Sequence, residues 1–143
     1  MKARQIISER SFVLVFETGD EAVKGLLEFA RENEVKTAFF FGIGAFGRVT
    51  LAYFDLEKKN YEHIPIDEQV EVMSLAGNIS RLEGDPKVHA HVVVGNRDGA
   101  AHGGHLIEGV VRPTLEIFMS VSETPLRRKL DAATNLPLLD LNE

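Results

Sequence analysis

Residues 87–121 read KVHAHVVVGNRDGAAHGGHLIEGVVRPTLEIFMSV, and this stretch decides the fold. Its segments 87–95, 104–111 and 114–121 are rich in β-branched and apolar residues, a composition that predicts three consecutive strands. The loop Asn96-Arg97-Asp98-Gly99 consists of turn-forming residues and can reverse the chain between the first two strands. Strands joined by so short a loop run antiparallel. The stretch therefore predicts an antiparallel sheet.

The rest of the chain adds further strands and one principal helix. Strands are expected over residues 12–16, 35–41, 48–55, 61–66 and 70–82, the last as one strand or two. Between Glu21 and Glu32 the apolar residues follow helical spacing, with acidic residues expected in the first turn. Thr18-Gly19-Asp20 supplies turn and N-cap chemistry just before this helix.

The tail, residues 126–143, is expected to pack on the domain as a loop or short helical turn with a final edge strand. Its Arg127-Arg128-Lys129 run is interpreted as a solvated basic turn. One early helix followed by a run of strands predicts an α+β fold with a mainly antiparallel sheet. At 143 residues the chain fits a single compact domain over residues 1–143.

Composition excludes several classes of protein. No apolar run approaches the roughly 18 residues of a membrane span. The chain has no cysteine, which excludes disulfides and thiolate ligands and fits a cytoplasmic location. Its net charge of −6 argues against a surface built mainly to neutralise phosphates.

The segment Gly42-Ile43-Gly44-Ala45-Phe46-Gly47 matches the GxGxxG dinucleotide fingerprint. That fingerprint needs a helix to begin within it, so that the helix N-terminus can hold the pyrophosphate. Residues 48–54 are instead β-branched and aromatic. We therefore interpret these glycines as serving a tight bend between strands, where Cβ atoms would clash.

Three of the five histidines form the main chemical motif. His89 and His91 occupy positions i and i+2 of a strand, so both imidazoles point to one face. The turn after them can bring His105 alongside. Three neutral imidazoles around an open position are the ligand set of a catalytic-type zinc site, although nickel, copper and iron also accept this set. We expect His63 to face solvent and His102 to lie at the turn, outside the site.

Glu116 is an acid inside a strand otherwise suited to the core. It either faces solvent or lies near the metal, where it would orient a histidine or take a proton from bound water as a candidate catalytic residue. No Ser-His-Asp arrangement is legible in the sequence.

Four short motifs, in this order, resemble those of the PPC (plants and prokaryotes conserved) domain: Gly42-Ile43-Gly44-Ala45, Leu75-Ala76-Gly77-Asn78-Ile79, His89-Ala90-His91-Val92 and Gly103-Gly104-His105-Leu106. The resemblance runs from Arg10 to Val121. It implies a compact α+β fold that assembles as a homotrimer. It also implies a divalent ion, zinc, at His89, His91 and His105.

The resemblance leaves two functions open. The first is a trimeric metal-binding module with a regulatory, DNA-binding role. Plant members carry an AT-hook, an Arg-Gly-Arg-Pro segment that enters the minor groove; because this sequence contains no such segment, its own residues give DNA binding no support. The alternative is a zinc-dependent enzyme acting on a small molecule, whose ion would polarise a substrate oxygen or lower the pKa of its water to about 7.

Overall fold

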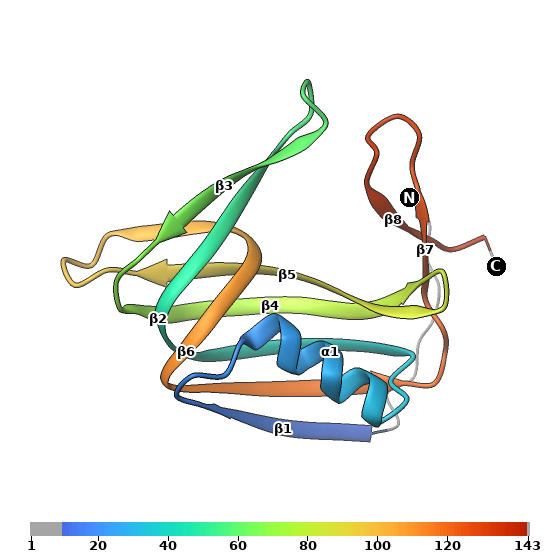
Figure 1. Cartoon of the computed structure of the whole chain (residues 1–143). Helices are drawn as coiled ribbons and strands as arrows, with labels where there is room; N and C mark the ends of the chain where they lie inside the picture. The colour runs from blue at the N-terminus through green and yellow to red at the C-terminus, as the bar shows by residue number, and fades with distance from the viewer. Residues whose placement is uncertain (1–9, 143) are drawn as a thin grey trace.

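The computed structural model describes residues 10–142; residues 1–9 and 143 of the expected domain lie outside this range. Residues 10–142 form one helix and eight strands, whose arrangement Figure 1 shows. In chain order they are β1 (Arg10–Glu17), α1 (Ala22–Glu32), β2 (Thr37–Asp55), β3 (Asn60–Ile66), β4 (Val70–Leu82), β5 (Asp85–Gly95), β6 (Ala101–Ser122), β7 (Arg127–Leu130) and β8 (Pro137–Asp140).

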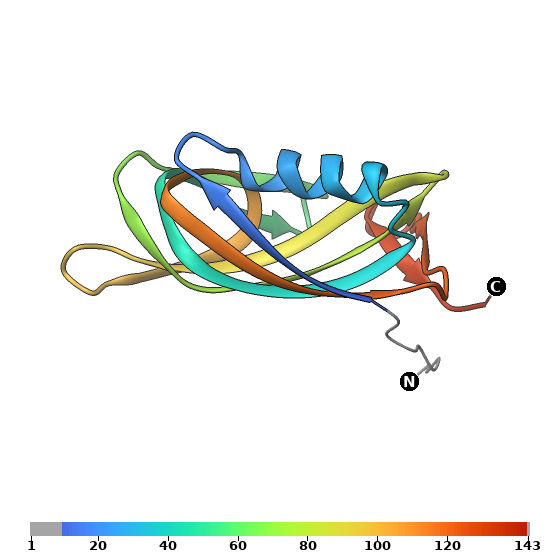
Figure 2. The same ribbon diagram turned by 90° about the horizontal axis from the view of Figure 1, so that it is seen from below.

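The sheet curls until it closes on itself. Strand β2 pairs with β4, β4 with β5, β5 with β6 and β6 again with β2, all antiparallel. Strands β1 and β3 extend this circuit at β6 and β2. Helix α1 lies along the concave side of the curled sheet (Figure 2). The expected α+β fold, mainly antiparallel with one helix, is confirmed.

Two strands are much longer than the sequence predicts. The segments 35–41 and 48–55 belong to the single strand β2, and 104–111 and 114–121 belong to β6. The pairing register shifts near Gly42, Gly44 and Phe46, so both strands bend without ending. The prediction of separate strands was wrong because irregular pairing bends a strand where a turn was expected.

The GxGxxG segment lies inside β2, and no helix begins within it. A Cβ atom on Gly42 would lie 2.7 Å from the carbonyl oxygen of Glu116 in β6. A Cβ atom on Gly44 would also collide with the backbone of β6, at Thr114. The glycines therefore let two strands approach closely, as interpreted, although at a bend within a strand.

Helix α1 begins at Ala22, one residue later than expected. The Glu21 carboxylate accepts hydrogen bonds from the backbone N–H groups of Val23 (3.0 Å) and Lys24 (2.7 Å), so Glu21 is the N-cap. It also accepts from Gly109 N–H at 2.9 Å, which ties the helix to β6. With Glu21 at the cap, the first turn holds no acid, contrary to expectation. The face of α1 that packs in the core carries Ala22, Leu26 and Ala30.

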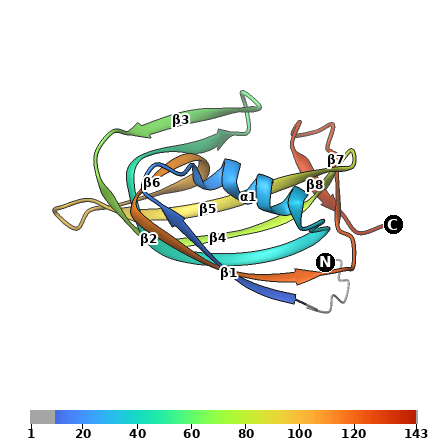
Figure 3. The ribbon, with the colours of Figure 1, turned by 60° about the horizontal axis from the view of Figure 1, so that its bottom comes forward.

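The side chains of β5 point alternately into the core and to the outer face of the sheet. Val88, Ala90 and Val92 are buried in the core, while His89 and His91 point to the outer face. The tail forms the hairpin β7–β8, in which β8 is the expected final edge strand and β7 lies where a loop or short helical turn was expected. Strand β7 pairs in parallel with β4. This hairpin stands beside the β4–β5 turn (Figure 3). Within the described residues, no helix has both the length and the hydrophobicity to cross a membrane.

Candidate metal centre

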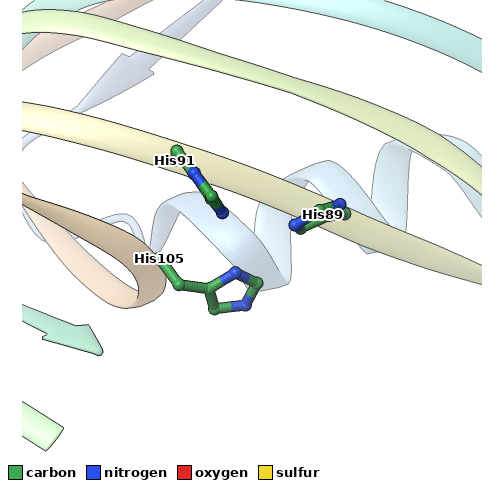
Figure 4. Close-up of side chains that lie close together, drawn as sticks. All are labelled: His89, His91 and His105. Atoms are coloured by element: carbon green, nitrogen blue, oxygen red, sulfur yellow. The ribbon is translucent and has the colours of Figure 1, made fainter. Parts of the chain in front are cut away.

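Two neighbouring strands bring the three expected histidines together. His89 and His91 extend from β5, and His105 lies directly opposite His91 on β6. The ring centroids are 5.1 Å apart for His89 and His91, 5.2 Å for His89 and His105, and 5.5 Å for His91 and His105. One nitrogen from each ring lies within 4.8 Å of the others. The imidazoles converge on one point outside the sheet (Figure 4).

The arrangement fits a metal ion. Tetrahedral zinc with Zn–N bonds of about 2.1 Å holds its ligand nitrogens roughly 3.4 Å apart, so small side-chain rotations would complete the site. The Nδ1 atom of His105 is buried and has no hydrogen-bond partner among the described residues. Because a buried polar atom without a partner is costly, this nitrogen fits the role of a metal ligand.

The surroundings keep the imidazoles of His89 and His105 neutral. Burial lowers the pKa of His105 to about 4, with a further contribution from His89 and His91. Burial also lowers the pKa of His89, and the nearby Arg128 guanidinium adds to this effect. Since only a neutral imidazole binds a metal, His89 and His105 are ready to bind one at neutral pH without losing a proton.

Arg128 connects the tail to this centre. Its Nε donates to Ser80 Oγ at 2.7 Å, Nη1 to the Pro137 carbonyl at 2.7 Å, and Nη2 to Asn78 Oδ1 at 2.8 Å. Nη2 also lies 3.4 Å from Nδ1 of His89. Burial lowers the pKa of Arg128. Metal-binding histidines more often contact a carboxylate or carbonyl, and a guanidinium here makes His89 a less basic ligand.

The basic run of the tail was therefore interpreted wrongly. Arg127 and Lys129 are exposed, but Arg128 is half-buried between them because β7 is a strand whose side chains alternate. A solvated turn would have exposed all three side chains.

A cavity of about 130 Å³ opens beside His89 and His105. The Tyr61 ring forms one side of it, with its centroid 4.9 Å from that of His105. Burial raises the pKa of Tyr61, so its hydroxyl stays protonated at neutral pH. The other lining residues are Lys87, Val88, Arg128, Leu136, Pro137 and Leu138.

The remaining candidates lie outside this site. His63 is exposed on β3, and His102 is exposed opposite Val94 near the β5–β6 turn, both as expected. Glu116 faces solvent in a shallow groove that it shares with Ile43 and Met73. It does not line the cavity beside the histidines, so the solvent-facing alternative describes its position.

Sequence reasoning missed three polar residues of the cavity, Lys87, Tyr61 and Arg128. Lys87 has the same strand parity as His89 and His91, and this alternation was the signal that could have found it. Tyr61 and Arg128 come from β3 and β7, and no local pattern links either residue to the histidines.

The Plants and Prokaryotes Conserved (PCC) domain family matches residues 5–123, and the chain belongs to this family. A plant- and prokaryote-conserved (PPC) protein of Pyrococcus horikoshii is 34% identical, with a TM-score of 0.92, covering 98% of this chain and 97% of that one. A metal-containing protein of Archaeoglobus fulgidus is 32% identical, with a TM-score of 0.91, covering 98% and 99%.

Two further relatives are less similar in sequence and have different descriptions. A proposed DNA-binding protein of Bacteroides thetaiotaomicron is 26% identical, with a TM-score of 0.90, covering 98% of this chain and 100% of that one. The bifunctional protein GlmU of Synechococcus sp. (strain JA-3-3Ab) is 28% identical over 129 residues. This match takes in 89% of the present chain but spans only 20% of the length of that protein.

Proposed function

We propose that the protein binds a divalent metal ion, zinc, through His89, His91 and His105, and that the ion keeps a coordination position open to a small molecule. The observation that carries the proposal is the convergence of three imidazoles beside a cavity, with the Nδ1 atom of His105 buried and unpartnered. Three protein ligands rather than four are typical of zinc sites that bind a further ligand. The similarity to the metal-containing protein of Archaeoglobus fulgidus supports the same proposal.

The open position would suit chemistry on a small molecule. A bound ion supplies a Lewis acid that polarises a ligand oxygen. Tyr61 and Arg128 border the cavity beside it, so the chain offers a neutral hydroxyl donor and a fixed positive charge to orient that ligand. Glu116 has no part in this proposal because it lies on a different groove.

Elemental analysis of the purified protein tests the metal site. We expect close to one zinc per chain in the unmodified protein and a near-complete loss in His91→Ala and His105→Ala. His102→Ala is the matched control, since it removes an exposed imidazole from the same hairpin without touching the cluster. Full metal content in His105→Ala would show that the ligand assignment is wrong.

We also propose that the protein forms the homotrimer that its family resemblance implies. Seven large apolar side chains are exposed on the outer face of β1, β6, β2 and β4, where Phe41 and Phe118 stack with centroids 5.4 Å apart. An apolar patch of this kind on a folded chain typically marks an interface between proteins. Its members, named here the outer apolar face, are Val13, Val15, Phe39, Phe41, Ile43, Met73 and Phe118.

The outer apolar face continues into the metal centre. Phe41 pairs with Ala76, Ala76 with His91, and His91 with His105, so these residues form one row across the outer side of the sheet. Subunits that pack through this face would therefore lie close to the ion. Analytical ultracentrifugation tests the assembly: Phe118→Asp should dissociate the trimer, whereas Leu56→Asp, which changes an exposed leucine outside this face, should not. A monomeric unmodified protein would contradict the proposal.

A regulatory role through DNA is the second candidate. Its support is the similarity to the proposed DNA-binding protein of Bacteroides thetaiotaomicron, together with membership of the family. The net charge of −6 makes phosphate-driven binding weak.

A further inference from the structure

The cavity beside the histidines carries positive charge that the protein does not balance. Lys87 and Arg128 both line it, and no carboxylate does. Within residues 10–142, the ion pairs of the structure involve neither Lys87 nor Arg128. Because a partly buried charge without a partner is unfavourable, the cavity is suited to an anion.

Arg128 is held in place for this role. Three of the five N–H groups of its guanidinium donate to Ser80, Pro137 and Asn78, all neutral acceptors, and Nη2 also lies 3.4 Å from Nδ1 of His89. These contacts fix the plane of the group but leave its charge unpaired and one N–H on Nη1 available. A positioned guanidinium binds an anion with less loss of conformational entropy than a mobile side chain.

Much of the remaining lining of the cavity is apolar. Val88 and the tail residues Leu136, Pro137 and Leu138 line it together with the two basic residues. A volume of about 130 Å³ limits the ligand to a few non-hydrogen atoms. A ligand that contacts both kinds of residue needs a negative group and a short hydrocarbon chain.

The geometry points to a small organic carboxylate as the ligand of this site, with its carboxylate beside Arg128 and Lys87 and its apolar chain against Leu136–Leu138. The inference deepens the proposed function, since it rests on the cavity beside the ion being the ligand's place. Inorganic phosphate would match the charge but would leave the apolar lining uncovered, so we expect it to bind more weakly than the carboxylate.

The test is an NMR titration of ¹⁵N-labelled, metal-free protein with butyrate. We expect saturable shifts in the backbone amides of Val88, Leu136 and Leu138. Butyramide, which has the same chain without the charge, and inorganic phosphate, which has charge without the chain, should both bind more weakly. Equal binding of butyrate and butyramide, or no shifts at these amides, would overturn the inference.

Two variants and a matched control identify the charges responsible. Arg128→Gln should weaken butyrate binding by at least about tenfold, the usual effect of losing a charge-assisted hydrogen bond. Lys87→Gln alters an exposed side chain, so it tests the same point without disturbing the tail, and it should also weaken binding. Arg127→Gln removes the same charge from the exposed side of β7 and should have no effect. Equal affinity in all three variants would overturn the inference.

Repeating the titration with zinc-loaded protein separates this inference from the proposed function. If zinc binds but butyrate does not, the proposed function stands and the carboxylate inference fails. If the protein takes up no zinc but binds butyrate through Arg128, the carboxylate inference stands and the metal proposal fails.

Discussion

Replacing Gly77 by alanine should destabilise the protein and loosen its metal centre together. Gly77 lies in β4 between Phe40 of β2 and Ala90 of β5. A Cβ atom there would lie 2.5 Å from the Phe40 ring, 2.6 Å from the carbonyl oxygen of His89 and 2.9 Å from Cβ of Ala90. Carbon atoms pack favourably at about 3.5–4.0 Å, so all three neighbours are too close.

The loss of stability in Gly77→Ala depends on whether these three neighbours can move. Phe40 is 2% exposed and Ala90 is 2% exposed, so neither can turn into solvent. The third neighbour is backbone, and displacing the His89 carbonyl displaces a proposed metal ligand. Overpacking of this kind typically costs 1–3 kcal/mol, and we expect Gly77→Ala to lower the free energy of unfolding by about 2 kcal/mol.

Urea unfolding at one fixed protein concentration measures this loss. With a slope of roughly 2 kcal/mol per molar urea, the midpoint should fall by about 1 M. Gly103→Ala is the matched control, since a Cβ atom there meets its nearest neighbour, Val93, at 3.5 Å, an ordinary contact. Its midpoint should stay close to that of the unmodified protein. Equal midpoints for Gly77→Ala and the unmodified protein would refute the packing argument, and unchanged zinc affinity would refute the link to His89.

Three further predictions concern the site and its partners. Zinc at 100 times its dissociation constant should raise the free energy of unfolding by about 2.7 kcal/mol, and this gain should vanish in His105→Ala; a gain retained in the variant would point to another site. In the metal-free protein, NMR should find that the His105 imidazole titrates with a pKa of about 4. The imidazole of the unfolded chain binds this proton near pH 6.5. The stability contributed by neutral His105 should therefore be complete above pH 6.5 and lost as pH falls towards 4. A pKa of about 6.5 for His105 in the folded protein would mean that its ring is hydrated. Finally, an A·T-rich duplex should bind weakly at low salt and detach as salt rises, because the chain is acidic; tight binding that survives physiological salt would favour the regulatory candidate.

The alternation of side chains along a strand made the histidine cluster predictable. Positions 89 and 91 must share a face in any regular strand, and a turn at 96–99 must return the chain beside it. The pairing of His91 with His105 agrees with this reasoning. The same alternation made the burial of Val88, Ala90 and Val92 predictable, as the 3.6-residue period did for the helix.

The bends in β2 and β6 were not predictable in this way. Near Gly42 and Gly44 the composition resembles that of a turn, and only the backbone of β6 lying against these glycines shows that the strand continues. A local pattern cannot report a contact between segments about seventy residues apart in the chain.

The sequence by itself determined the helix, most of the strand segments and which side of β5 faces the core, because strand and helix periods are local properties of the backbone. It also determined the three histidines of the cluster. The tertiary structure decided what surrounds them: closure of the sheet brings Tyr61 against His105, and the parallel pairing of β7 with β4 places Arg128 beside His89. These contacts depend on how distant strands pair, so the combination of basic and apolar residues around the cavity is decided by the fold.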